Sequence, residues 1–246
     1  MAIFYQLQDV IAKKGGCYIV LIDPDRKNDH TIENQITLAN DSDVDAIFVG
    51  GSLMMDSKCA QRVKKIKALS NIPVIFFPGG VGQLNPHYDA ILFMSILSGR
   101  NPHYLIGEQV IAAPLIKDMG IETISTGYIL IDGGAQSTVE FMSGTKPIPM
   151  ERTDITVAHA LAGQYLGMDL IYLEAGSGAK NPVPISMIEA VNEAIDGHLI
   201  VGGGINTPEK AESAVKAGAS IVVTGTAIEN NLNIMKEFSD AIHKDK

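Results

Sequence analysis

The stretches LIVGGGINTPE at Leu199–Glu209 and IVVTGTA at Ile221–Ala227 have the same order: an apolar run, then glycine, then the start of a helix. In the first stretch, Asn206 or Thr207 can cap the helix, and Pro208 suits its first turn. Glycine has no Cβ, so the backbone N–H groups of such turns can approach an anion closely. Two such turns, one strand apart near the end of a β/α chain, are typical of the phosphate site that (β/α)8 barrels build after strands 7 and 8. The alternative is a pair of tight turns that bind nothing.

The rest of the chain alternates apolar runs with helical patterns. The runs are almost continuously apolar, as expected of parallel strands covered by helices. Eight strands with helices between them favour one closed barrel over a doubly wound sheet, and no composition shift divides the 246 residues. We therefore predict an α/β fold, a single (β/α)8 TIM barrel domain over residues 1–246. The predicted strands are Tyr18–Ile22, Ala46–Val49, Pro73–Phe77, Ala90–Met94, Glu122–Ile131, Leu170–Glu174, His198–Val201 and Ser220–Val223.

Two connections depart from a regular barrel. Pro78–Asp89 contains three glycines and two prolines, so we predict an irregular connection there in place of the third barrel helix. It is a candidate for a loop that closes over the site. The polar stretch Gly133–Met150 is interpreted as a second insertion. The predicted helices are an amphipathic N-terminal helix over Met1–Lys14 and, further along, Thr31–Asn40, Ser57–Leu69, Ile106–Met119, Thr153–Leu166, Pro184–Ile195, Pro208–Ala217 and Asn230–His243.

Composition excludes several classes of protein. The formal net charge of −9 argues against a nucleic-acid binder, which would show a basic stripe. Cys17 and Cys59 have neither CxxC nor zinc spacing, which predicts free thiols in a reducing compartment. The N-terminus lacks the basic-then-apolar order of a signal peptide, and no run of about 18 apolar residues occurs. We expect a cytoplasmic protein without a transmembrane segment.

In a parallel barrel, catalytic groups lie where the strands end. The first strand is followed by Asp23 and Asp25. Mg²⁺ typically takes one or two carboxylates, with waters and substrate phosphates completing its octahedron, so Asp23 is a candidate metal ligand. The alternative is that one aspartate caps the next helix and the other pairs with Arg26. Capping and support of a metal fit Asp25 equally well.

Glu174 ends a strand that is otherwise apolar. A carboxylate in that position is costly unless it has a hydrogen-bonding partner or a function. Close to the phosphate turns, it is suited to accept a hydrogen bond or a proton from a hydroxyl of a bound phosphate ester. The alternative is a carboxylate buried against a lysine or backbone donors. Ser177 lies in a further glycine-flanked turn. Arg100 and Asn101, in a polar turn, are candidate diphosphate contacts, and the alternative for Arg100 is a solvated surface residue.

These residues together resemble the geranylgeranylglyceryl phosphate synthase family, which shares its barrel with the heptaprenylglyceryl phosphate synthases of bacteria. The resemblance extends over nearly the whole chain, and the run from Tyr172 to Gly178 is its most specific part. The matching pieces are Leu21–Asp25 (LIDPD), Val49–Ser52 (VGGS), Phe77–Gly79 (FPG), Ser98–Tyr104 (SGRNPHY), Thr126–Tyr128 (TGY), Tyr172–Gly178 (YLEAGSG), Val201–Gly204 (VGGG) and Thr224–Thr226 (TGT).

The resemblance implies transfer of a prenyl group from a prenyl diphosphate to the free hydroxyl of sn-glycerol 1-phosphate, which forms an ether lipid precursor. It implies Mg²⁺ as the cofactor, with Asp23 and Ser52 as metal positions. Glu174 then either accepts the proton of the hydroxyl or only orients it. The insertion Gly133–Met150 and the chain length are similar to the longer subgroup, which favours a geranylgeranyl donor. The implied glycerol phosphate contacts are Tyr172, Leu173, Glu174, Ala175, Gly176, Ser177, Gly178, Gly203, Gly204, Gly225 and Thr226.

Several expectations remain open. The prenyl tail needs an apolar groove, for which Met54, Met55, Phe93 and Tyr104 are candidate lining residues. Alternative functions are a heptaprenyl transferase with a longer donor, a barrel isomerase or aldolase acting on a sugar phosphate, and a non-catalytic glycerol phosphate binder. We expect small-molecule substrates as the partners, no nucleic acid, and a homo-oligomer that assembles through outer helices.

Overall fold

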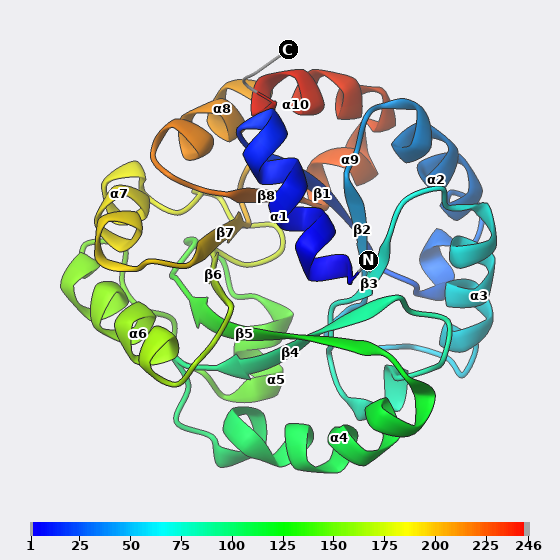
Figure 1. Cartoon of the computed structure of the whole chain (residues 1–246), viewed down its shortest axis with the longest axis horizontal. Helices are drawn as coiled ribbons and strands as arrows, with labels where there is room; N and C mark the ends of the chain where they lie inside the picture. Colours follow the sequence, from blue (N-terminus) through cyan, green and yellow to red (C-terminus); the bar gives the residue numbers. More distant parts are fainter. Residues whose placement is uncertain (1, 244–246) are drawn as a thin grey trace.

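The computed structural model describes residues 2–243, in which eight parallel strands form a closed barrel (Figure 1). The strands pair in chain order, and β1 pairs with β8 with Cys17 opposite Ile221 and Val20 opposite Thr224. The predicted barrel is therefore confirmed. The strands are β1 (Cys17–Ile22), β2 (Ala46–Val49), β3 (Val74–Phe76), β4 (Ala90–Ile96), β5 (Glu122–Leu130), β6 (Leu170–Glu174), β7 (His198–Gly202) and β8 (Ile221–Thr224).

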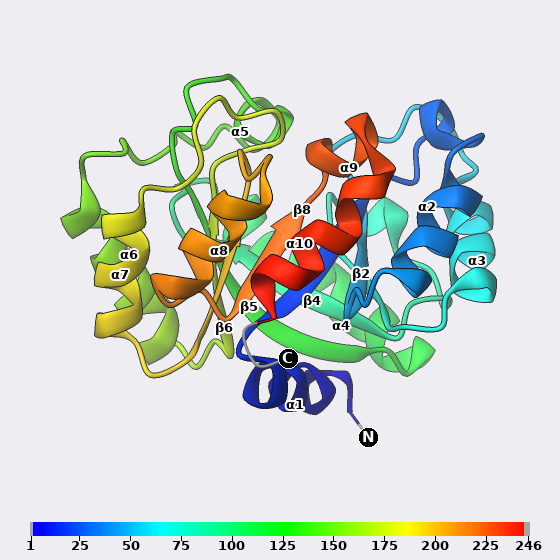
Figure 2. The same cartoon turned by 90° about the horizontal axis from the view of Figure 1, so that it is seen from above.

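Most helices cover the outside of the barrel, but α1 lies across one end of it, and α5 and α9 lie at the other end (Figure 2). Helix α8 begins as its sequence predicts, because the Thr207 side chain accepts from the Lys210 N–H and Pro208 occupies the first turn. The helices are α1 (Ile3–Lys14), α2 (Ile32–Asp41), α3 (Cys59–Leu69), α4 (Glu108–Met119), α5 (Thr138–Ser143), α6 (Thr153–Tyr165), α7 (Ile185–Ala194), α8 (Pro208–Lys216), α9 (Thr226–Asn230) and α10 (Met235–Ile242).

The connection between β3 and β4 has the irregular form that its glycines and prolines predict. Its one helical segment is a 3-10 turn at Val81–Gln83. Hydrogen bonds to neighbouring segments hold it in place. The Glu108 carboxylate at the start of α4 accepts from the Val81 N–H at 2.7 Å. The Gln83 amide donates to the Gly51 carbonyl at 2.6 Å, so the connection is also tied to the loop after β2.

The helices differ in detail from the predicted ones in three places. The insertion Gly133–Met150 contains α5, whose start is capped by the Ser137 hydroxyl accepting from the Glu140 N–H at 3.2 Å. Ser137 and Glu140 have the spacing of a capping box, a signal that we overlooked in the sequence. The helix predicted over Asn230–His243 consists of a 3-10 turn, Leu232–Ile234, followed by α10, and the separate short helix α9 precedes it. The 3-10 turn begins where the Asn231 side chain accepts from the Asn233 N–H.

The third difference concerns the start of the helix over Ile106–Met119. Helix α4 itself begins at Glu108 and is preceded by a π-helical turn, His103–Gly107. The wider turn leaves backbone carbonyls without their usual helical donors. The Gln109 amide donates to the Tyr104 carbonyl at 3.3 Å, and the Ser95 hydroxyl donates to the Leu105 carbonyl at 2.9 Å. Side chains therefore compensate for the irregular turn, which sequence periodicity does not reveal.

Strand residues alternate between the barrel interior and the helical layer. In β1, Cys17 and Ile19 pack inside, whereas Tyr18 and Val20 pack under the helices. Helix α1 closes the amino end of the barrel, where Leu7 joins the interior cluster at 2% exposure. The Glu122 carboxylate on β5 anchors the first turn of α1 by accepting from the Ile3 and Phe4 N–H groups.

The closing role of α1 can be tested with Leu7→Ala. Because Leu7 fills the amino end of the barrel, its removal should lower the free energy of unfolding by about 2–5 kcal/mol. Tyr5→Ala on the exposed face of the same helix, where Tyr5 is 62% exposed, is the control and should change it little. Urea unfolding followed by circular dichroism measures both. Equal effects of the two substitutions would show that α1 is not part of the core.

Candidate active site

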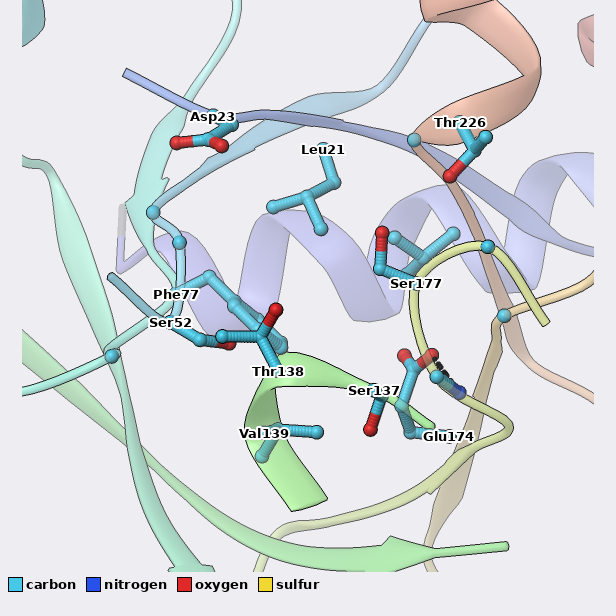
Figure 3. A pocket seen from close by; sticks show the side chains of 18 of the residues that line it. Leu21, Asp23, Ser52, Phe77, Ser137, Thr138, Val139, Glu174, Ser177 and Thr226 are labelled. Atoms are coloured by element: carbon cyan, nitrogen blue, oxygen red, sulfur yellow. Dashed lines mark hydrogen bonds between the residues drawn. The ribbon is translucent and has the colours of Figure 1, made fainter. Parts of the chain in front are cut away.

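A cavity of about 540 Å³ opens at the carboxyl ends of the strands. Its floor is aromatic: Phe77, Tyr128 and Tyr172 line it, with ring centroids 5.8 Å apart for Phe77 and Tyr172 and 5.4 Å for Tyr128 and Tyr172. Figure 3 shows Asp23 and Glu174 on opposite sides of this cavity. The structure thus brings most of the predicted site residues together: Asp23, Ser52, Tyr172, Glu174, Gly176, Ser177, Gly178, Gly203, Gly204, Gly225 and Thr226 all line it.

Four of the predicted contacts lie elsewhere. Leu173 and Ala175 belong to the buried layer between strands and helices, because neighbours in a strand point to opposite faces. Arg100 is exposed, and its guanidinium donates to the Leu97 and Gly99 carbonyls. The Asn101 amide donates to the Ser143 carbonyl at the end of α5, at 3.1 Å. The structure therefore does not support Arg100 or Asn101 as diphosphate contacts, and Asn101 instead holds α5.

The glycine turns form a group of unpaired backbone donors. Within residues 2–243, the N–H groups of Ser177, Gly178, Gly203, Gly204 and Gly225 make no hydrogen bond to the protein. These N–H groups line the cavity and are exposed or half-buried, so an anion can reach them, and free N–H groups of glycine turns are suited to bind one.

Glycine is required at position 203 in particular. Its φ is +80°, and a Cβ there would lie 2.5 Å from Glu174 Oε1 and 2.7 Å from the Gly176 nitrogen. A side chain at this position would therefore push into both Glu174 and the neighbouring turn, besides straining the backbone.

Glu174 is buried, with 7% of its surface exposed. Burial disfavours its charged form and raises the pKa of the carboxyl to about 7, although the Gly176 N–H, which donates to Oε1 at 2.7 Å, opposes this shift. Gly202 leaves room for Tyr172 and Glu174, since a Cβ there would lie 2.6 Å from the Tyr172 hydroxyl and 2.7 Å from Glu174 Oε2. The Tyr172 hydroxyl lies beside the Glu174 carboxyl and also opposes the rise of its pKa. A carboxyl that can gain or lose a proton near neutral pH thus lies beside a tyrosine hydroxyl.

The Asp23 carboxylate has an incomplete set of partners. Its Oδ2 lies 3.2 Å from the Lys27 ammonium, whereas its buried Oδ1 has no hydrogen-bond partner in the described chain. Burial raises the pKa of Asp23, and Lys27 opposes this shift. Gly51 leaves the space beside the carboxylate, because a Cβ there would lie 2.7 Å from Asp23 Oδ1. Ser52 follows directly and lines the same cavity.

Asp25 has a different role from Asp23. Its side chain is buried and accepts from the Lys27 N–H at 3.2 Å and the Met55 N–H at 3.0 Å. These backbone donors lower the pKa of Asp25 against the effect of its burial. Asp25 therefore caps one loop and ties it to the next, which is the capping alternative considered from the sequence. Within residues 2–243, no group of three or more His, Cys, Asp or Glu residues is arranged to hold a metal, so any cation here needs ligands beyond carboxylates.

Sequence reasoning missed the contribution of α5. Ser137, Thr138, Val139, Met142 and Ser143 line the cavity, and Figure 3 shows Thr138 and Val139 reaching it from this short helix. The capping box at the start of α5 predicts a helix, but its position over the mouth depends on the Asn101 and Tyr104 side chains, which donate to its last carbonyls.

Comparison with known proteins agrees with this geometry. The PcrB family matches residues 8–244. A geranylgeranylglyceryl phosphate synthase from Chitinophaga pinensis is 45% identical over 98% of this chain and 96% of its own length. One from Thermococcus kodakarensis is 48% identical over 89% of this chain and 86% of its own. The crystal structure of (S)-3-O-geranylgeranylglyceryl phosphate synthase from Thermoplasma acidophilum in complex with substrate sn-glycerol-1-phosphate superimposes with a TM-score of 0.89, at 35% identity, over 97% of this chain and 98% of that one.

The chain therefore belongs to the PcrB family, and the family resemblance found in the sequence is confirmed. It is a prenyltransferase of the class to which these synthases belong. No helix among residues 2–243 is long and apolar enough to cross a membrane.

The anion-binding role of the glycine turns can be tested with Gly203→Ala. The new Cβ would press on Glu174 and the Gly176 turn, so binding of a small phosphate ester should weaken about tenfold or more, equivalent to about 1.4 kcal/mol. Isothermal titration calorimetry measures the affinity.

Gly167→Ala is a matched control for this substitution. Its φ of +81° gives a similar backbone strain, about 1–2 kcal/mol, but nothing lies within 4 Å of the added Cβ. Affinity losses of equal size in the two variants would mean that backbone strain, and not contact at the site, weakens binding.

Proposed function

We propose that this protein transfers the geranylgeranyl group of geranylgeranyl diphosphate to the free primary hydroxyl of sn-glycerol 1-phosphate in a Mg²⁺-dependent reaction. The products are an ether-linked geranylgeranylglyceryl phosphate and diphosphate. The observation that carries the proposal is the arrangement of one cavity, with Glu174 beside unpaired N–H groups on one side and the incompletely partnered Asp23 on the other. The substrates named for the relatives fit these two sides.

The glycine turns are suited to the phosphate of the acceptor. The N–H groups of Gly203, Gly204 and Gly225 are free for a phosphate, and Ser177 and Thr226 add hydroxyls to the same wall. The acceptor hydroxyl then extends toward Glu174. In the Thermoplasma acidophilum structure the bound substrate is sn-glycerol 1-phosphate, which supports this choice of acceptor.

Glu174 is suited to move the proton of the reaction. A new C–O bond forms between the acceptor hydroxyl and C1 of the prenyl group, the bond from C1 to the diphosphate oxygen breaks, and the hydroxyl proton passes to a Glu174 oxygen. A pKa of about 7 leaves much of the carboxyl ionised at neutral pH while keeping it basic enough to accept this proton. The aromatic floor around Tyr172 excludes water from the reacting atoms.

The residues around Asp23 fit a divalent cation. The buried Oδ1 lacks a partner, Gly51 keeps space beside the carboxylate, and Ser52 adds a neutral oxygen at the same wall. Mg²⁺ is usually bound through one or two carboxylates together with waters and substrate phosphates, so a larger carboxylate cluster is not needed. When bound, Mg²⁺ supplies positive charge that stabilises the leaving diphosphate. Asp23 and Ser52 are the residues that would hold it.

A small apolar cavity of about 70 Å³ adjoins the polar one and offers apolar contacts to part of a prenyl tail. Pro78, Gly79, Met94, Ile96 and Tyr104 line both cavities, so the two are neighbours. The irregular connection after β3 forms part of the wall, where a regular barrel would carry a helix. Of the groove residues expected from the sequence, Phe93 and Tyr104 line this cavity, Met55 lines the polar one, and Met54 packs beside Gly51.

We also propose that the protein forms a homo-oligomer. An exposed apolar surface on α4 and the π-helical turn before it supports this proposal, because such surfaces often mark contact sites. The side chains of this surface are Ile106, Val110, Ile111 and Leu115.

The reaction can be tested by extraction. Labelled sn-glycerol 1-phosphate incubated with Mg²⁺ and geranylgeranyl diphosphate should enter the organic phase, and chelation of the metal should prevent it. Asp23→Asn should lower the Mg²⁺-dependent rate by about 10–100-fold or more, because it removes the ligand charge. A heptaprenyl donor in parallel tests the longer tail. Label transfer without any diphosphate donor, or full activity of Asp23→Asn, would contradict the proposal.

The pH dependence of the reaction tests Glu174. Because the base must be ionised, kcat/KM should rise with pH through about 7 and level off above it. Glu174→Gln should lower turnover by about 10²–10⁴-fold and remove this rise. The acceptor phosphate also titrates in this region, and a rise caused by the phosphate would remain in Glu174→Gln. Ser177→Ala, which keeps Glu174, is the control and should retain the wild-type profile. A rise that persists unchanged in Glu174→Gln would show that another group titrates.

A further inference from the structure

The side chain of Arg62 lies behind the cavity and not in it. Arg62 is in the first turns of α3, its side chain is 6% exposed, and it is not among the described residues that line the polar cavity. A buried guanidinium is costly unless its donors are satisfied. Here all five N–H donors are used, in five hydrogen bonds to Asp29, Asp56 and the Pro24 carbonyl.

The partners of Arg62 come from two different loops. Toward the loop after β1, Nε and Nη2 donate to the Asp29 carboxylate at 2.5 and 3.0 Å, and Nη1 donates to the Pro24 carbonyl at 3.3 Å. Toward the loop after β2, Nη1 and Nη2 donate to the Asp56 carboxylate at 2.6 and 2.7 Å. One planar group therefore bridges two carboxylates, each in the paired geometry that arginine favours.

The same two loops carry the candidate cation ligands. Asp23 directly precedes Pro24, and Ser52 lies in the loop that ends at Asp56. The Asp25 carboxylate makes a second tie between the loops by accepting from the Met55 N–H at 3.0 Å. The loops follow neighbouring strands, β1 and β2, but no backbone hydrogen bond of the described chain joins the segments 23–29 and 51–56 to each other. The last backbone bond between them is that of the Gly50 N–H to the Ile22 carbonyl at 3.2 Å, at the strand ends, and beyond it side chains tie the loops together.

We propose that Arg62 is a positioning residue that holds the loops after β1 and β2 at the spacing at which Asp23 and Ser52 can share one divalent cation. The inference rests on the proposed function, since it concerns the same cation. Asp29 and Asp56 are the intermediaries. The guanidinium keeps the pKa of each of these carboxyls below its usual range, so both stay charged and paired at neutral pH.

Arg62→Lys is the informative substitution. Lysine keeps the positive charge, but its single ammonium cannot make two paired contacts with two carboxylates. We expect Mn²⁺ binding, measured by electron paramagnetic resonance with Mn²⁺ as the probe, to weaken about 10–100-fold, the usual effect of losing an outer support of a metal ligand. The Mg²⁺ concentration for half-maximal activity should rise by a similar factor. The affinity for sn-glycerol 1-phosphate without metal should stay within about twofold, because the glycine turns lie on the other side of the cavity.

Lys67→Met is the matched control. Lys67 is in the same helix and makes an ion pair of 2.7 Å with Asp89, away from both loops. The Lys67→Met variant should be less stable than the wild type but should bind Mn²⁺ with the same affinity. Should Arg62→Lys fail to fold, as judged by near-ultraviolet circular dichroism, Asp56→Asn gives the same comparison, because it weakens the tie to the Ser52 loop alone.

The outcomes separate this inference from the proposed function. Wild-type protein that transfers prenyl groups and binds Mn²⁺, with unchanged Mn²⁺ binding in both Arg62→Lys and Asp56→Asn, would overturn the positioning role and leave the proposed function intact. Equal losses of Mn²⁺ and glycerol phosphate affinity would also overturn it, since they indicate general loosening. Absence of prenyl transfer and of Mn²⁺ binding in the wild type would overturn both.

Discussion

The parallel pairing of β1 with β8 joins the first strand of the barrel to the last. The register places Val20 opposite Thr224, and the Tyr18 hydroxyl meets the Thr224 hydroxyl at 2.8 Å behind the pair. Without this closure, the loop that carries Asp23 and the turn at Gly225 would be at opposite edges of an open sheet. With it, the start and the end of the chain share one wall of one cavity. The pairing of β6 with β7 completes the mouth by placing Glu174 opposite Gly202.

The mouth contains charge that the fold itself does not neutralise. Burial raises the pKa of both Asp23 and Glu174, and each keeps only a partial set of partners, Lys27 for one and the Gly176 N–H for the other. Local departures from full hydrogen bonding are expected at functional sites, where a ligand completes the set. By contrast, the supports behind the mouth are complete, since Arg62 uses every donor and Asp25 is held by backbone N–H groups. The enzyme therefore combines a fully bonded frame with an incompletely bonded surface.

Much of the site follows from residues at strand ends. Asp23, Glu174 and the glycines of the last two turns could be identified because a parallel barrel gathers all its strand ends at one rim, whatever the sequence distance between them. Side-chain direction could not be predicted in the same way. Leu173 and Ala175 were implied contacts as part of the run from Tyr172 to Gly178, but their side chains pack in the outer core. Arg100 follows a strand end, yet its guanidinium bonds to nearby carbonyls, which a linear sequence does not indicate.

The sequence alone predicts the alternation of strands and helices, the missing helix after β3 and the glycine turns. It can do so because hydrophobic periodicity and backbone freedom are local properties. Three features needed the folded molecule. The position of α5 over the mouth depends on Asn101 and Tyr104. The break between α9 and α10 depends on a local side-chain hydrogen bond, and Arg62 joins the two loops. The position of α5 and the joining of the two loops depend on contacts between segments distant in sequence. The break between α9 and α10 arises because a side chain competes with the helix for a backbone N–H group. Patterns along the chain predict which elements form, whereas the meeting of distant polar groups depends on how those elements pack.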